Sequence, residues 1–210
     1  MGDDAELLQR WHRGDKTAGN ELFARHFPAL RRFFRNKVGH EEAEDLIQRT
    51  MLETVRSAPS FRGEASFRTF IFTIARRELC HHIRRKHRKG NDADIDFSVS
   101  SLEALGTSPS GFAAQKQDHQ RILAALRAIP LDFQITLELH YWEQLDGKEL
   151  AEVLGIAPGT VRSRLHRARA ALRELLESRE GAPATEDLES SITAARPRES
   201  SGNAAPPSGH

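Results

Sequence analysis

Apolar residues recur along this chain every three or four positions, whereas the alternation typical of β-strands is rare. This spacing predicts helices over residues 21–38, 41–57 and 66–89 in the first part of the chain. It predicts two more helices, over residues 118–129 and 132–143, in the second part of the chain. We therefore expect an all-α protein.

The segment from Gly147 to Leu172 has the clearest pattern, and it predicts two helices joined by a tight turn. Asp146 can cap the first helix, with Glu149 three residues on as its reciprocal partner. Gly155 suits the left-handed residue that ends a helix, and Pro158 suits the first turn of the next helix. Together these signals predict a helix-turn-helix, whose second helix typically enters the DNA major groove.

The second of these helices has an apolar face and a basic face. Apolar residues at helical spacing predict which side faces inward. Arginine-rich helix faces are common on ordinary surfaces, so basic density alone does not establish DNA binding. The basic helix in a capped helix-turn-helix does favour DNA binding. The residues expected inside are Val161, Leu165, Ala168 and Leu172, and those on the basic face are Arg162, His166, Arg169 and Arg173.

Composition divides the chain into segments of different character. Residues 1–89 and 116–178 are the two predicted helical modules. Residues 90–115 between them are rich in Gly, Ser and Asp and predict a flexible linker. Residues 179–210 end in a stretch rich in Pro, Gly, Ala and Ser and predict a disordered tail. Two small modules on a tether suggest a protein that holds two sites at once.

Charge is separated along the chain, although the formal net charge is only +1. Residues 41–45 are acidic, and residues 76–89 are strongly basic. An acidic amphipathic helix suits docking on a basic protein surface, with a simple solvated face as the alternative. The basic end of the helix over 66–89 suits contact with phosphates, which does not depend on base sequence.

Cys80 is the single cysteine, so an intramolecular disulfide is impossible and a reducing compartment is expected. The acidic start of the chain lacks an apolar targeting region, and no apolar run is long enough to span a bilayer. We therefore expect a cytoplasmic protein. Cys80, His81 and His82 point in different directions on a helix, so no metal site is predicted. Nothing resembles an H-E-x-x-H motif or a Gly-rich phosphate loop, which argues against an enzyme.

Three segments resemble the bacterial RNA polymerase sigma-70 family, in its extracytoplasmic-function (ECF, group 4) branch. EEAEDLIQRTMLETV is similar to the helix that binds core polymerase. FRGEASFRTFIFTIARRELCHHIRRKHR is similar to the loop and helix that read and melt the −10 element. LDGKELAEVLGIAPGTVRSRLHRARAALREL is similar to the −35-reading domain. The short linker, which has no room for a further domain, points to the compact branch.

This resemblance implies two helical domains, sigma region 2 over residues 1–89 and sigma region 4 over residues 116–178. It implies a factor that brings core RNA polymerase to promoters, without catalytic activity, cofactor or metal. The implied polymerase-binding residues are Glu44, Asp45, Leu46 and Gln48. The implied −10 residues are Phe61, Arg62, Gly63, Glu64, Arg77, Arg84 and Arg85. The implied −35 residues are Thr160, Arg162, Ser163, Arg164, His166, Arg167 and Arg169.

The resemblance also implies partners. They are the β′ clamp helices and the β flap of core RNA polymerase, promoter DNA, and an anti-sigma factor. The alternative is a helix-turn-helix transcriptional regulator that binds duplex DNA without core polymerase. The loop and basic helix over 61–89 argue against that alternative.

Overall fold

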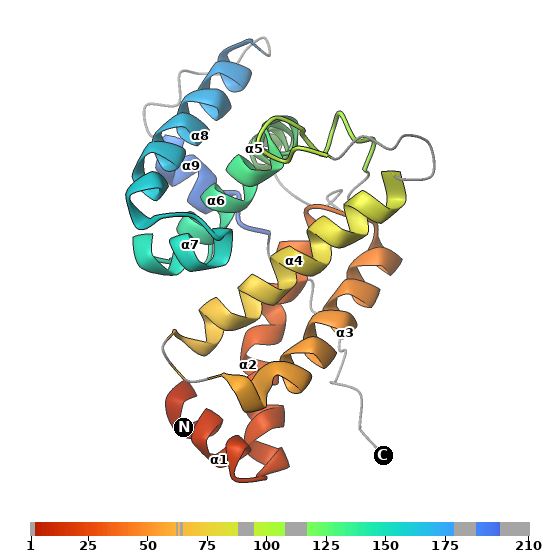
Figure 1. Ribbon diagram of the computed structural model, residues 1–210. Coiled ribbons are helices and arrows are strands. Elements are labelled where there is room, and N and C mark those ends of the chain that lie inside the picture. Colours follow the sequence, from red (N-terminus) through yellow and green to blue (C-terminus); the bar gives the residue numbers. More distant parts are fainter. Residues whose placement is uncertain are drawn as a thin grey trace.

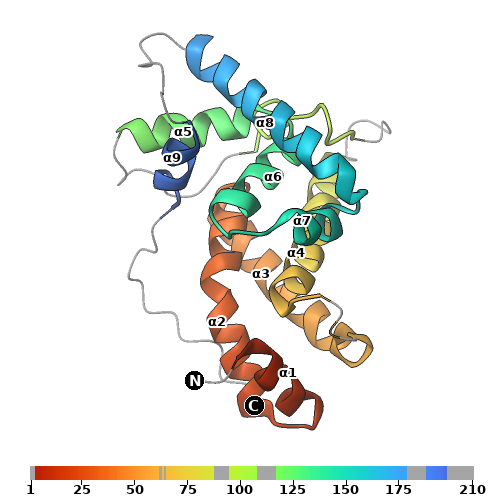
Figure 2. The ribbon, with the colours of Figure 1, turned by 90° about the vertical axis from the view of Figure 1, so that its left-hand side faces the viewer.

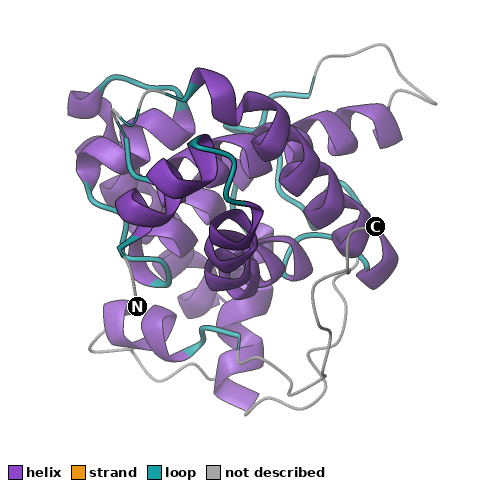
Figure 3. Cartoon of the chain, turned by 90° about the horizontal axis from the view of Figure 1, so that it is seen from below, coloured by secondary structure: helices purple, strands orange, loops and turns teal. Residues whose placement is uncertain are grey.

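The computed structural model describes residues 3–61, 63, 65–87, 95–107, 117–178 and 188–197. These residues form helices joined by loops, without a β-strand among them (Figure 3). The prediction of an all-α protein is thus confirmed. None of the helices in these ranges is long and apolar enough to cross a membrane.

In the described residues, the N-terminal module consists of four α-helices and one short 3-10 turn. Helix α4 runs alongside α3 (Figure 1). The three helices predicted here are present, with ends shifted by a few residues. The Ser66 hydroxyl oxygen accepts a hydrogen bond from the Thr69 amide at 3.1 Å and so caps α4. The first helix was not predicted. The helices are α1 (Asp4–His12), α2 (Lys16–Arg35), α3 (His40–Ser57) and α4 (Phe67–His87), with the 3-10 turn at Ala58–Ser60.

The C-terminal module contains the helix-turn-helix, with the caps that the sequence predicts. The Asp146 carboxylate accepts hydrogen bonds from the amides of Lys148 and Glu149, and Glu149 accepts one from the Asp146 amide at 3.0 Å. Gly155 ends the first helix with φ of 64°, in the left-handed region. The helices are α5 (Gln117–Ala128), α6 (Leu131–Tyr141), α7 (Gly147–Leu154) and α8 (Pro158–Ser178).

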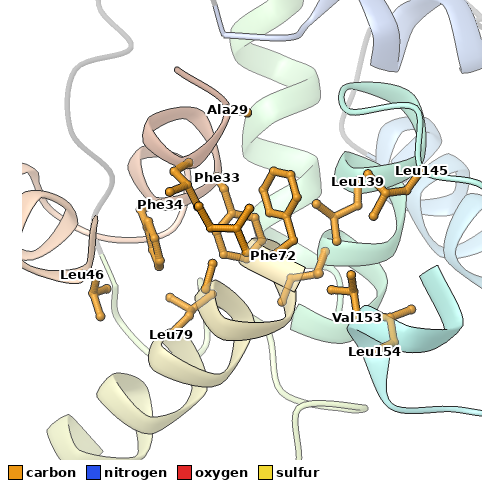
Figure 4. Close-up of a cluster of buried hydrophobic side chains, with 14 of the residues drawn as sticks. Ala29, Phe33, Phe34, Leu46, Phe72, Leu79, Leu139, Leu145, Val153 and Leu154 are labelled. Atoms are coloured by element: carbon orange, nitrogen blue, oxygen red, sulfur yellow. The ribbon is translucent and has the colours of Figure 1, made fainter. Parts of the chain in front are cut away.

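The two modules pack directly against each other and share one apolar core. Helix α4 lies against α7, as both ribbon views show (Figures 1 and 2). Phe33 and Phe72 of the N-terminal module lie in one cluster with Leu139, Val153 and Leu154 of the C-terminal module (Figure 4). In this arrangement the modules form a single closed body.

The predicted linker is folded where the structure describes it, over residues 95–107. Phe97 and Leu102 are buried in the shared core. The backbone of this segment is also bonded to α6, because the amides of Leu131 and Asp132 donate to the carbonyls of Ser100 and Phe97. Because residues 90–115 are mostly polar, the sequence did not reveal that Phe97 and Leu102 are buried. Their burial and the backbone hydrogen bonds fix the described part of this segment against the two modules.

The predicted disordered tail also contains structure, because residues Leu188–Ala194 form helix α9. Leu188, Ile192 and Ala195 are spaced by four and three residues, so they share a face, and all three are buried. The remaining residues of 179–210, apart from 195–197, lie outside the described ranges. A helix of seven residues is too short to give a strong pattern, and its stability comes from packing.

Candidate nucleic-acid and protein-binding surfaces

The outward face of α8 gathers four of the predicted −35 residues. Val161, Ala168 and Leu172 are buried on the opposite side, which fixes the orientation of the helix. Thr160 is half-buried in the first turn, and its carbonyl accepts a hydrogen bond from the Ser163 hydroxyl at 2.9 Å. The exposed residues are Arg162, Ser163, His166 and Arg167.

Two other predicted −35 residues, Arg164 and Arg169, are held by carboxylates of the protein. Arg164 is only 14% exposed, and its Nη1 lies 3.3 Å from Oδ2 of Asp132. Arg169 donates from Nε to the Tyr141 hydroxyl at 2.8 Å and lies 3.3 Å from Oε1 of Glu189. The face of α8 that can meet DNA is therefore narrower than the basic sequence suggests.

The loop before α4 presents an aromatic pair. The Phe61 ring stacks on Phe70, with centroids 4.4 Å apart and planes inclined by 26°. Gly63 adopts φ of 74°, which a residue with a Cβ rarely does. Arg62 and Glu64, also predicted to contact the −10 element, lie outside the described residues. Phe61 is thus partly buried against the core, with one face of its ring stacked on Phe70.

The remaining predicted −10 residues lie along α4. Arg77 is exposed, and so are Arg84 and Arg85 near the end of the helix. The Arg84 guanidinium lies 4.9 Å above the Phe97 ring, which ties it to the folded part of residues 95–107. Beside them, Lys86 forms an ion pair of 2.8 Å with Glu42 of α3. The end of α4 therefore carries exposed basic residues, two of which, Arg84 and Lys86, also contact other parts of the protein.

Helix α3 corrects one of the predicted polymerase-binding residues. Leu46 is fully buried in the core, because it lies on the face that packs against α2 and α4, so it cannot meet a partner. Glu44 is half-buried and lies 3.8 Å from Arg31. Asp45, which pairs with Arg49 at 2.9 Å, and Gln48 are exposed.

An exposed line on α3, here called the α3 stripe, contains two residues that the sequence analysis did not select. Leu52 and Val55 are 58% and 48% exposed, although both side chains are apolar. The signal that could have found them is the spacing, since residues 41, 45, 48, 52 and 55 recur at four and three positions on one face. The α3 stripe is Glu41, Asp45, Gln48, Leu52 and Val55.

Charged groups are buried where the two modules meet. Lys37, two residues after the end of α2, is fully buried and pairs with Glu138 of α6. Burial lowers the pKa of Lys37, and the opposing charge of Glu138 resists that change. Arg32 donates two hydrogen bonds to Oε1 of Glu143, at 3.1 and 3.0 Å. These pairs join α2 to α6 and its C-terminal end.

Two further carboxylates connect α4 of the N-terminal module to α7 and α8 of the C-terminal module. Asp132 accepts a hydrogen bond from Arg76 of α4 at 3.0 Å while it also pairs with Arg164 of α8. Glu149 of α7 accepts hydrogen bonds from the hydroxyls of Ser66 and Thr69, at 2.9 and 3.1 Å. Partial burial opposes the shift, but these bonds, together with the bond from the Asp146 amide, lower the pKa of Glu149.

The histidines and the cysteine of α4 do not converge on one point. Cys80 is buried, and burial raises the pKa of its thiol, which makes it a poor nucleophile. His82 is buried beside Glu42, with 3.4 Å between Nε2 and Oε1, whereas His81 is exposed. Among the described residues, no group of three or more His, Cys, Asp or Glu could hold a metal ion.

Two solved structures have a similar fold over most of this chain. CnrH in complex with the cytosolic domain of CnrY matches with a TM-score of 0.62 and 23% identity, over 84% of this chain and 99% of that chain. The sigma factor RpoE in complex with the anti-sigma factor NepR, from Bartonella quintana, matches with a TM-score of 0.58 and 28% identity, over 76% of this chain and 97% of that one. The first shows similarity of fold alone.

Sequence comparison gives the same result over most of the chain. The ECF RNA polymerase sigma-E factor of Haemophilus influenzae is 26% identical over 84% of this chain and 94% of its own length. The ECF RNA polymerase sigma-E factor of Escherichia coli K12 is 25% identical over 80% of this chain and 92% of its own length. The Sigma-70 region 2 family matches residues 22–89, and the Sigma-70, region 4 family matches residues 119–172. With both of its modules matched in order, the chain belongs to the sigma-70 family of RNA polymerase sigma factors, in the ECF branch.

Proposed function

We propose that this sigma factor binds core RNA polymerase through the α3 stripe and reads promoter DNA with α8 and with the loop and helix from Phe61 onward. It would act as an initiation factor in the cytoplasm, without catalysing a reaction itself. The observation that carries the proposal is the division of α8 into an exposed basic face and a face held by the protein's own carboxylates.

The −35 element would be read by Arg162, Ser163, His166 and Arg167. Their exposure on one face near the N-terminal end of α8 supports this role, since that end of a recognition helix contacts base edges. A well-placed arginine on guanine contributes about 1–3 kcal/mol of discrimination. We assign Arg164 and Arg169 a positioning role, because Asp132 and Glu189 already pair with them.

The −10 element would be read and held open by the first part of α4 and its loop. Unstacked bases bind to aromatic surfaces beside positive charge, and Phe61 stacked on Phe70 offers such a surface. Arg77 would contact the same DNA strand as these aromatic residues. Arg85 would contact phosphates together with Arg84. Arg62, Gly63 and Glu64 remain assigned to this site from the sequence.

Core polymerase would dock on the α3 stripe. The stripe is acidic at one end and apolar at the other, which suits a partner surface that is basic and partly apolar. By resemblance this partner is the β′ clamp helices, and the C-terminal module would meet the β flap. An anti-sigma factor is also expected, because RpoE of Bartonella quintana has been solved with one.

Reading both elements at once requires the modules to separate. The two elements are about 25 base pairs apart by their names, or roughly 85 Å along the duplex at about 3.4 Å per pair. In the closed arrangement α4 lies against α7, and Asp132 joins Arg76 of one DNA-facing helix to Arg164 of the other. The closed form is therefore a resting form, and promoter binding would break these contacts.

Run-off transcription with purified core polymerase tests the proposal. Arg162→Ala should reduce initiation about tenfold or more, whereas Arg173→Ala, an exposed arginine further along α8, should change it little. Leu52→Asp should weaken binding to core polymerase, whereas Val99→Asp, at another exposed apolar residue, should not. A chain that binds duplex DNA but not core polymerase would instead be a helix-turn-helix regulator.

A further inference from the structure

Helix α9 packs on the C-terminal module against α5 and α6 (Figure 2). We call the apolar surface that it covers the groove; residues of α8 belong to the same buried cluster. Leu188, Ile192 and Ala195 are 3%, 0% and 0% exposed. Six of the buried residues that share one apolar cluster with α9 belong to α5, α6, α8 and the position directly after α6. They are Ile122, Leu126, Leu137, Trp142, Leu172 and Leu176.

Polar contacts fix the direction and register of α9 in this groove. The Trp142 indole Nε1 donates to the Ile192 carbonyl at 2.7 Å. Glu189 lies 3.3 Å from Nε of Arg169, and Arg196 lies 3.6 Å from Glu143. Glu189 and Arg196 are 56% and 45% exposed, so both charge pairs lie on the rim of a dry contact. This is the usual construction of a helix docked in a groove.

The docked helix is a small addition to a module that has its own core. Helices shorter than about 12 residues are marginal in water, so α9 depends on the groove for its conformation. Leu123, Ala125 and Ile129 are buried with Ala168 and Leu172 in the same cluster. The C-terminal module therefore keeps apolar packing of its own when α9 leaves.

We propose that α9 is a displaceable intramolecular ligand of this groove, which it closes to amphipathic helices of the same pattern on other proteins. That pattern is a large apolar residue, an acidic residue directly after it, and further apolar residues four and seven positions on. Nine residues of sequence separate Ser178 from Leu188, so α9 is covalently confined near the groove, and for a linker this short the effective concentration is on the order of millimolar. A competing helix must exceed this concentration or bind more tightly.

Displacement has a second consequence for α8. Glu189 pairs with Arg169, which also bonds to the Tyr141 hydroxyl. When α9 leaves, Arg169 loses its carboxylate partner, and a ligand with an acidic residue in the same place restores it. Occupation of the groove and the charge on this part of α8 are therefore linked.

A labelled peptide of residues 186–197 tests the proposal by fluorescence anisotropy with full-length chains. The unaltered chain should bind it poorly, because the groove is filled. Ile192→Lys should undock the chain's own α9 and bind the peptide at least tenfold more tightly. Ala194→Lys is the matched control, since Ala194 is exposed on the same helix and should behave as the unaltered chain.

A second variant, Leu188→Lys, guards against a local defect, and circular dichroism with thermal unfolding establishes that each variant is folded. Equal peptide binding by all chains would overturn the proposal. So would the absence of binding to folded Ile192→Lys and Leu188→Lys chains, or a dimer in which α9 fills the groove of a second copy. No polymerase or DNA is used, so the result is independent of the proposed function.

Discussion

Helix α6 and the residues that follow it take part in two interfaces that are built in different ways. Toward the N-terminal module, α6 presents Asp132 and Glu138, which are buried and paired with cations. Toward α9, the contact is apolar around Trp142, with its charge pairs on the exposed rim. Glu143 belongs to both, because it accepts from Arg32 and also lies near Arg196.

The difference predicts how each interface opens. A buried ion pair has already lost its hydration, so removing one partner leaves a charge that neither water nor protein stabilises. Loss of a single charged residue therefore destabilises the whole interface, and the interface opens as a unit. A small apolar contact with solvated charges can separate without exposing a buried charge, so α9 should leave first and the modules should part later.

The largest effect should follow the loss of one buried charge. Glu138→Ala leaves the Lys37 ammonium without its partner in a fully buried site. We expect the free energy of unfolding, measured in urea, to fall by about 3–5 kcal/mol. The double variant Lys37→Met with Glu138→Met should recover most of this loss. A cost for the single variant below about 1 kcal/mol would mean that the interface is hydrated in solution.

A smaller effect is expected at α9, although Ile192 is as buried as Glu138. In a core, truncation of isoleucine to alanine costs about 2–5 kcal/mol. Here Ile192→Ala should lower the free energy of global unfolding by less than about 1 kcal/mol, because α9 undocks instead. Hydrogen exchange of residues 188–197 should become fast, with Ala194→Ser as the control. A full core-like loss in urea would contradict separate undocking.

The helix-turn-helix shows what the sequence could predict. Its caps, turn and inward residues depend on neighbours in the chain, so Asp146, Gly155 and Val161 were assigned correctly. Residues at four-and-three spacing also identified which side of α8 is basic. The sequence could not show which arginines of α8 are free to bind DNA and which are held by the protein. The partners of Arg164 and Arg169 lie on α6 and α9, which are distant from them in sequence.

The features that sequence reasoning missed are all products of tertiary packing. Helix α9 is seven residues long, and its three apolar residues acquire meaning only beside the groove. The closed arrangement of modules depends on Lys37 and Glu138, which look like ordinary surface charges in the sequence. Val55 is apolar and would be expected in the core from its side chain alone, but in the described part of the chain its face of α3 is exposed.

The contact of Glu149 with α4 should give a modest dependence on pH. Its pKa is lowered in the fold, so its stabilisation is present above the ordinary value of 4.5 and is lost as the pH falls through the lower value. Glu149→Gln keeps the capping geometry and should cost less than about 1 kcal/mol near neutral pH. Urea midpoints between pH 7 and acid should then decline less steeply in the variant than in the unaltered chain.

The smallest effect should be the titration of Tyr141, the single tyrosine of the chain. Burial, and then hydrogen bonding with Glu189 of α9, raise the pKa of this tyrosine above 10. Undocking α9 with Ile192→Lys removes the Glu189 bond and the part of the burial that α9 supplies, so tyrosinate absorbance should appear at lower pH than in the unaltered chain. Glu189→Gln, which keeps α9 docked, should lower the pKa only in part.

Because the pKa is raised, the stabilisation linked to Tyr141 is complete below pH 10 and is lost as the pH rises through the folded value. Identical titrations in all three chains would show that α9 does not cover Tyr141 in solution, and the contrast between the two interfaces of α6 would then fail.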